Sequence, residues 1–259
     1  TAAWLGRVAR VGLGSLAASL VLNADVVVLG LRRSPAEVAA YGLATKVPLF
    51  LSSLDGLVYT ALFPTLVRAV ASRDVARQRR LAERALALGL GAGVPGAAAI
   101  GFTAEPFAVL LFGDQFRAAA PLLAVLAWRV PLAAASGIFQ SLVWEANPER
   151  EAALTVTVAL ATLVPLPFVA SHAGPAGVAA CMLLGLAFGL ALFVRAAAIP
   201  GVALARPLGW SVAGAAISVG LLVALGPRNG PAGVAQMLAA WTVGSAVALL
   251  ALRPRSRQP

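Results

Sequence analysis

The chain has 259 residues, of which 60% are hydrophobic and only 12% charged, and its mean hydropathy is +0.89. A soluble globular domain is usually about 45–50% apolar and about 25% charged, and a globule of this size has too little interior to hide the surplus. These figures argue against a water-soluble protein and against disorder, and the single cysteine, Cys181, argues against a disulfide scaffold. A polytopic membrane protein remains.

Eight runs of sequence are long and apolar enough to cross a bilayer as helices. A span needs about 20 mostly apolar residues, because the hydrocarbon core is about 30 Å thick and a helix rises about 1.5 Å per residue. A barrel strand needs only about 9–11 residues of alternating polarity, so these longer runs predict helices. The predicted fold is therefore an all-α transmembrane bundle of about eight spans. In chain order the expected spans are Val11–Leu31, Ala39–Leu66, Ala85–Ala104, Ala118–Trp144, Ala152–Ser171, Pro175–Ile199, Pro207–Gly226 and Ala232–Leu252.

The loops between these spans carry most of the charge and strong helix breakers, in the stretches Arg32–Pro35, Asn147–Arg150, His172–Pro175 and Gly226–Pro231. Fourteen of the 20 Lys and Arg residues fall on one side of the predicted bundle and four on the other. Cytoplasmic loops carry an excess of Lys and Arg, so this bias predicts that both ends of the chain are cytoplasmic. It also accounts for the net charge of +10 without a nucleic-acid partner. The richer side holds Arg7, Arg10, Arg68, Arg73, Arg77, Arg79, Arg80, Arg84, Arg150, Arg195, Arg206, Arg253, Arg255 and Arg257; the other holds Arg32, Arg33, Arg117 and Arg228.

The side chains of an enzyme or an ATP-driven pump are not found together in this sequence. The chain has one His, one Cys and ten carboxylates, with no cluster at metal-ligand spacing. The glycines of Gly89–Gly93 are followed by apolar residues rather than by the Lys-Ser/Thr of a phosphate-binding loop. We therefore expect a protein that is not an enzyme and that uses no metal and no cofactor.

Four ionisable side chains lie well inside the predicted spans: Asp25, Lys46, Asp55 and Arg129. A charge near the bilayer centre costs at least about 2.5–3.5 kcal/mol, so such groups normally face a partner or a watery cavity. Asp25 and Lys46 lie about 9 and about 10 Å from the same membrane face on consecutive helices. We expect them to pair, either as a structural ion pair or as a cavity pair that opens when substrate or a cation binds.

Arg129 is eleven residues into its span, about 16 Å deep and near the midplane. Arginine suits a bidentate grip on phosphate, so Arg129 is a candidate ligand for a diphosphate headgroup. The alternative is an arginine that bonds backbone carbonyls at a helix break, since Pro131 follows two residues later. Asp55 lies deeper still, where it would bind a coupling cation or pair with Arg129.

Bent and closely packed helices are also expected. Gly185 and Gly189 stand four residues apart in the sixth span, a spacing that allows close helix contact. Prolines within spans permit bends, and bent helices around buried charges are common in transporters. The prolines concerned are Pro48, Pro64, Pro95, Pro131, Pro165 and Pro167.

A series of motifs, in order and spacing, resembles a known family. It comprises Asp25-Val-Val-Val-Leu-Gly30, Glu37-Val-Ala-Ala-Tyr41, Ala44-Thr-Lys46, Phe63-Pro64-Thr-Leu66, Leu110-Leu-Phe-Gly-Asp-Gln-Phe116 and Ala119-Ala-Pro-Leu-Leu123. The series looks like the C-terminal half of the polysaccharide-biosynthesis membrane proteins, the O-antigen and exopolysaccharide flippases. These belong to the superfamily of multidrug, oligosaccharidyl-lipid and polysaccharide exporters. The likeness covers roughly residues 10–200, and Ala40 departs from the glycine that the family often has there.

The resemblance implies two six-helix lobes around a central cavity. Residues 1–200 would form the second lobe and residues 201–259 an extra C-terminal helix pair, with a first lobe expected upstream. The family moves undecaprenyl-diphosphate-linked oligosaccharides between leaflets by alternating access, without ATP. By this resemblance Arg129 and Lys46 would bind the diphosphate, and Asp25 and Asp55 would bind a cation or form a gating pair.

The implied location is the bacterial cytoplasmic membrane, and the implied partners are lipid-linked oligosaccharide, membrane lipids, a polysaccharide polymerase and glycosyltransferases. Two alternatives stay open within transport: a lipid II exporter and a multidrug exporter of the same superfamily. A membrane glycosyltransferase or O-antigen ligase would belong to the same pathway. It should show a large outer loop or a cytoplasmic catalytic domain, and here every predicted outer loop is short.

Overall fold

A computed structural model describes residues 2–199, 202, 205–226 and 230–252, without the side chains of 2–3, 54–59, 61–62 and 205. Every regular element in this described part is helical, which confirms the predicted all-α fold class. The helices are α1 (Ala2–Arg32), α2 (Pro35–Ala71), α3 (Val75–Phe102), α4 (Ala104–Phe112), the short 3-10 helix η1 (Asp114–Ala119), α5 (Ala120–Leu126), α6 (Arg129–Ala146), α7 (Pro148–Leu163), α8 (Leu166–Ala197), α9 (Ala205–Leu225) and α10 (Gly230–Leu252).

Six stretches among the described residues are long and apolar enough to cross a membrane: Trp4–Arg32, Val75–Phe102, Asp114–Ala146, Leu166–Ala197, Arg206–Leu225 and Gly230–Leu252. Two of the eight expected spans are not in this set. One is α2, whose side chains are only partly described, and the other falls on α7, which has 16 residues. Arg228 and the three C-terminal arginines, which entered the charge bias, lie outside the described residues.

The predicted breakers end and start helices through specific contacts. Ser34 caps α2 in a reciprocal capping box with Glu37, and the Asn147 side chain accepts a hydrogen bond from the Arg150 backbone N–H at the start of α7. Between the fifth and sixth expected spans, the structure does not have the predicted loop. The chain instead makes a sharp kink at Gly174 within α8 (φ 61°, ψ −158°). Glycine readily takes this conformation because it has no Cβ.

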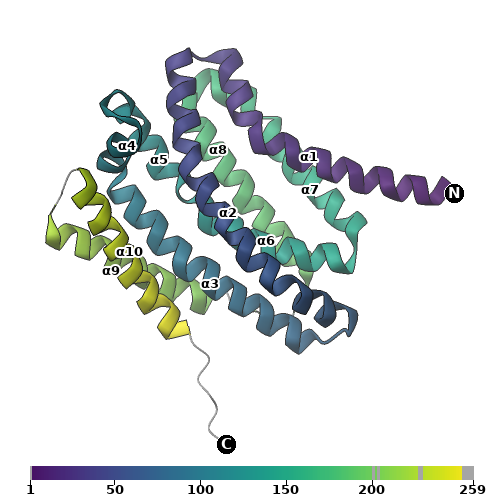
Figure 1. The fold of residues 1–259 in the computed structure, drawn as a ribbon. Helices are drawn as coiled ribbons and strands as arrows, with labels where there is room; N and C mark the ends of the chain where they lie inside the picture. The colour runs from purple at the N-terminus through teal and green to yellow at the C-terminus, as the bar shows by residue number, and fades with distance from the viewer. Residues whose placement is uncertain (1, 200–201, 203–204, 227–229, 253–259) are drawn as a thin grey trace, which may run out of the picture.

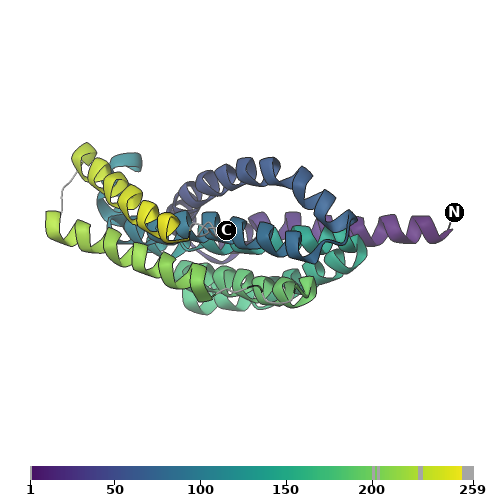
Figure 2. The same cartoon turned by 90° about the horizontal axis from the view of Figure 1, so that it is seen from below.

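The helices run back and forth along one bundle, as Figure 1 shows. The N-terminus of α1, the turn between α2 and α3 and the turn between α6 and α7 lie at one end, toward the right of Figure 1, which we call the arginine-rich end. Helix α1 packs along α7 and α8, and α3 lies between α6 and the pair α9 and α10. Seen from below, α2 bows away from the other helices (Figure 2), and it contains Pro48 and Pro64.

Small residues let the helices approach closely at several crossings. A Cβ at Gly185 would overlap the Thr162 side chain, and one at Gly189 would lie 3.3 Å from Val158, so the predicted glycine pair is where α8 packs on α7. On α3, a Cβ at Gly93 would lie 3.1 Å from Pro131. This glycine therefore seats the start of α6 against α3.

The C-terminal helix pair docks onto α3. The Trp241 indole N–H of α10 donates a 2.8 Å hydrogen bond to the Ala92 carbonyl, and the same ring covers Gly96. Between α9 and α10, the Ser218 hydroxyl bonds the Ala240 carbonyl at 3.0 Å, and Gly244 faces Gly214 backbone to backbone. The pair thus has its own small-residue interface in addition to its contacts with α3.

We expect Gly244→Ala to lower the melting temperature of the detergent-solubilised protein. The new Cβ would overlap the Ser218 hydroxyl and the Gly214 carbonyl, and the latter is backbone that cannot move aside easily. Overpacking costs about 1–3 kcal/mol, which exceeds the gain of about 1 kcal/mol in helix propensity. Gly220→Ala on α9 is the control: its Cβ would meet no atom within 4 Å, so stability should stay level or rise. Equal melting temperatures for the two variants would contradict this packing.

Candidate functional site

Of the predicted ionisable side chains, the structure describes three and buries two of them. Asp25 is 1% exposed and Arg129 is 8% exposed, whereas Lys46 lies exposed on α2. Asp55 belongs to α2, but its side chain lies outside the described residues. Asp25 and Arg129 are therefore the two buried charges around which the candidate site is described.

Asp25 does not pair with Lys46. Its Oδ2 accepts a 2.9 Å hydrogen bond from the Tyr41 hydroxyl, and its Oδ1 accepts one of 2.8 Å from the Val26 backbone N–H. At about 100° per residue, Lys46 lies roughly 140° around α2 from Tyr41. The expected ion pair is wrong because equal depth in the membrane does not put two side chains on facing sides of their helices.

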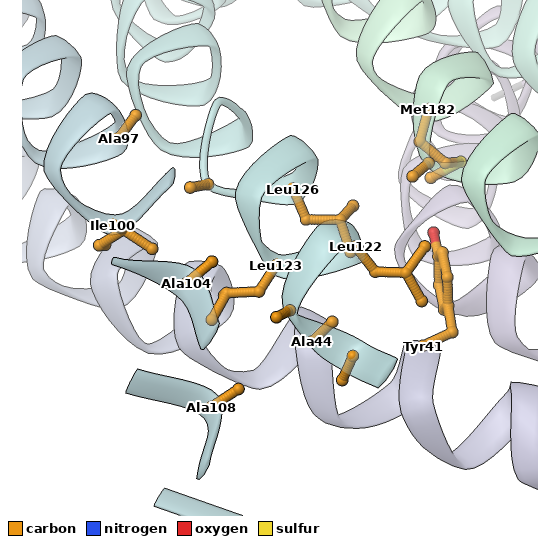
Figure 3. Packing of buried hydrophobic residues seen from close by; sticks show 14 of the residues in the cluster. Tyr41, Ala44, Ala97, Ile100, Ala104, Ala108, Leu122, Leu123, Leu126 and Met182 are labelled. Carbon is orange, nitrogen blue, oxygen red and sulfur yellow. The ribbon is translucent and has the colours of Figure 1, made fainter. Parts of the chain in front are cut away.

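Tyr41 is a site residue that the sequence reasoning did not single out. It is completely buried and lies on the inward face of α2 with Ala44, and its ring points toward Met182 of α8 and lies beside Leu122 of α5 (Figure 3). A buried phenol needs a hydrogen-bond partner, and here the partner is a carboxylate. The sequence does contain a signal for this residue. Tyr41 ends the motif Glu37-Val-Ala-Ala-Tyr41, and it lies on the face of α2 opposite the polar Lys46.

Arg129 stands at a break in its span. Helix α5 ends at Leu126 and α6 begins at Arg129, and Pro131 has no backbone N–H with which to continue the α-helical ladder. The Trp128 N–H bonds the Val125 carbonyl at 3.2 Å, and the Val130 N–H bonds the Ala127 carbonyl at 3.2 Å. The break therefore takes the tighter i to i−3 pattern.

The Arg129 guanidinium is a buried cation without a carboxylate neighbour in contact. Among the described residues it forms no ion pair within 4.0 Å and no hydrogen bond, so the alternative of carbonyl bonding at the break is not what the structure has. Tyr41 is close enough to feel the charges of both Arg129 and Asp25. The phenol thus bonds α2 to Asp25 of α1 and lies within electrostatic reach of Arg129 on α6.

This arrangement suits the binding of a charged group better than covalent chemistry. Arginine always carries its charge and presents several donors in a planar fork, which matches phosphate oxygens. In the described part of the chain, no three His, Cys, Asp or Glu side chains gather in a way that could hold a metal ion. The site offers one cationic position, Arg129, and one anionic position, Asp25, held by Tyr41.

Comparison with known proteins identifies one family. A family model described as MatE matches residues 11–170, which is well over half of the chain. The matched stretch runs from α1 into the first part of α8 and includes Asp25, Tyr41 and Arg129. No curated protein matches the chain.

We expect Tyr41→Phe and Asp25→Asn to be energetically coupled. Tyr41→Phe removes a hydrogen bond to a buried carboxylate, worth about 1.5–3 kcal/mol, and Asp25→Asn removes the charge that strengthens this bond. The double variant should therefore lose less stability than the sum of the single variants. The measurement is a double-mutant cycle on the free energy of unfolding in detergent. Additivity within about 0.5 kcal/mol would contradict the hydrogen bond.

Proposed function

Because the chain belongs to the MatE family, within the superfamily of multidrug, oligosaccharidyl-lipid and polysaccharide exporters, we propose that it is a flippase for lipid-linked oligosaccharides. Members of this family are transporters, and the chain is a multi-pass membrane protein. The substrate is the proposed part: an oligosaccharide on an undecaprenyl diphosphate, moved between leaflets by alternating access.

The observation that carries the proposal is the unpaired burial of Arg129. The residue lies at the middle of the 33-residue stretch Asp114–Ala146 and is 8% exposed. Keeping a cation there without a counter-ion costs free energy, and a bound diphosphate would repay that cost through bidentate, charge-assisted hydrogen bonds. A neutral or cationic substrate would leave Arg129 uncompensated.

Asp25 would take the cation or gating role. Its carboxylate accepts a hydrogen bond from the Tyr41 hydroxyl, and Tyr41 in turn lies within electrostatic reach of Arg129. A diphosphate on Arg129 would add negative charge near the Tyr41–Asp25 pair, and that charge would favour a cation beside it. Binding of the anionic headgroup would in this way be linked to binding of a cation.

The other two predicted side chains would act from α2. Lys46 is exposed on the face of α2 turned away from Tyr41, which would let it reach a headgroup between two lobes. Asp55 belongs to α2 and would serve as a second cation or gating group. Both roles depend on residues 1–200 being the second of two lobes, with residues 201–259 as an added helix pair.

The membrane placement follows from the same proposal. The arginine-rich end would face the cytoplasm of a bacterial cell, so headgroups would enter beside it and leave at the other end. The substrate would be made by glycosyltransferases on that side and joined by a polymerase on the far side.

Multidrug export by the same superfamily is the second candidate. Asp25 favours it, because a buried carboxylate that no cation contacts among the described residues could attract a cationic drug. The two candidates differ in which charge matters. Arg129 is essential for an anionic headgroup, and Asp25 is essential for a cationic drug.

We expect Arg129→Gln to slow flipping of lipid-linked oligosaccharide by at least about tenfold in proteoliposomes that contain the full-length protein, because one charge-assisted contact contributes about 1.5–3 kcal/mol. The control is Arg80→Gln, which removes the same charge from an exposed position at the arginine-rich end. Normal flipping by Arg129→Gln at a normal protein level would remove Arg129 from the substrate site. Efflux of ethidium that needs Asp25 but not Arg129 would favour the multidrug exporter.

A further inference from the structure

A pocket of about 430 Å³ lies near the arginine-rich end, away from Asp25 and Arg129. Its volume falls in the range of small-molecule sites, about 300–1,000 Å³. The walls come from α2, α6 and the first turn of α7. The lining residues are Phe63, Gly137, Gln140, Ser141, Trp144 and Glu151.

Glu151 is the unusual member of this lining. It is 5% exposed, and its Oε1 accepts hydrogen bonds from the Gln140 amide at 2.6 Å and from the Thr155 hydroxyl at 2.7 Å. Among the described residues it has no cationic partner. A buried carboxylate held only by neutral donors is costly, and its remaining lone pairs can accept hydrogen bonds from a ligand.

The arginines nearby do not compensate Glu151, because they bind its neighbour. Arg7 Nε lies 2.7 Å from Glu149 Oε1, and Arg10 Nη1 lies 3.1 Å from Glu149 Oε2. This pairing joins the N-terminal parts of α1 and α7 at the surface. Glu151 is therefore left facing the pocket with acceptor capacity that the protein does not use.

The chemistry of the lining matches a sugar. Trp144 and Phe63 offer flat apolar faces, and the Trp144 indole N–H donates to no other described residue. Glu151 supplies acceptors, the Gln140 amide supplies both a donor and an acceptor, and the Ser141 hydroxyl can accept. A sugar ring presents one apolar face and a rim of hydroxyls that both donate and accept. A bare metal ion would need more oxygen ligands and far less volume.

The pocket and Arg129 share one face of α6. Gln140 lies 11 residues after Arg129, which places it about 16 Å along the helix and about 20° around it. Trp144 is about 22 Å along and about 60° around. Between them stands Ser136 on the same face, buried and with its hydroxyl unbonded. One elongated polar ligand could therefore touch Arg129 and the pocket together.

We propose that this pocket is a sugar subsite, which takes a sugar residue beyond the first of an oligosaccharide whose diphosphate binds Arg129. The proposal rests on the function proposed above and adds to it the part of the substrate that this end of α6 recognises. A diphosphate does not span the distance from Arg129 to Gln140, so the group that fills the pocket belongs to the glycan.

The test uses two probes in proteoliposomes that contain the full-length protein: lipid-linked oligosaccharides extracted from the source organism, either intact or trimmed by glycosidases to one sugar. Trp144→Ala should slow flipping of the intact lipid about tenfold, as for truncation of a single aromatic anchor, and leave the trimmed lipid at the wild-type rate. Arg129→Gln should slow both lipids.

Two further variants keep the test independent of folding. Gln140→Ala retains the Thr155 hydrogen bond to Glu151. Like Trp144→Ala, it should slow flipping of the intact lipid and leave the rate of the trimmed lipid unchanged. Trp210→Ala on α9 removes an indole outside the pocket and should change neither rate. Equal slowing of both lipids, or of neither, by Trp144→Ala and Gln140→Ala would overturn the subsite and leave the flippase intact.

Two other outcomes would also overturn the proposal. If Glu151→Gln abolished efflux of ethidium and left both lipids unaffected, the pocket would bind organic cations. If the wild-type protein flipped neither lipid, the proposed function would fail and the subsite with it.

Discussion

A charge buried in a helical bundle must be compensated, and this constraint organises the chain. Asp25 meets it through the Tyr41 hydroxyl, which requires α2 to lie against α1 at that level. Arg129 does not meet it within the described residues. The fold thus holds one acid with a hydrogen-bond partner, Asp25, and one base without a partner, Arg129. A ligand of opposite charge would compensate Arg129.

The position of Arg129 depends on close packing as much as on charge. Pro131 interrupts the span between α5 and α6, and Gly93 lets α3 press against Pro131 itself. A Cβ at Gly93 would lie 3.1 Å from Pro131, so the start of α6 would have to shift by a few tenths of an ångström. Small residues on α3 therefore help to set the position of Arg129. Trp241 of α10 is hydrogen-bonded to the same helix, at the Ala92 carbonyl.

Helix α6 connects the two polar places of the molecule. Arg129 opens the helix near the middle of its span, and Gln140 and Trp144 line a pocket near the arginine-rich end. Both places are flanked by α2, which is near Arg129 at Tyr41 and reaches the pocket at Phe63. A movement of α2 would change both surroundings at once, so a ligand that binds along α6 would be coupled to the conformation of that helix.

The sequence by itself determined the helical membrane fold, the breakers at Ser34 and Asn147, and the places of Asp25 and Arg129 along their helices, because these depend on local composition and on a fixed rise per residue. Only the tertiary structure decided which charges face each other. Depth gives the height of a side chain but not its direction. Lys46 is therefore exposed, and Tyr41 is the residue of α2 that lies beside Asp25 in place of the expected Lys46. Likewise Glu151 became notable only when folding buried it next to Gln140, a residue on another helix.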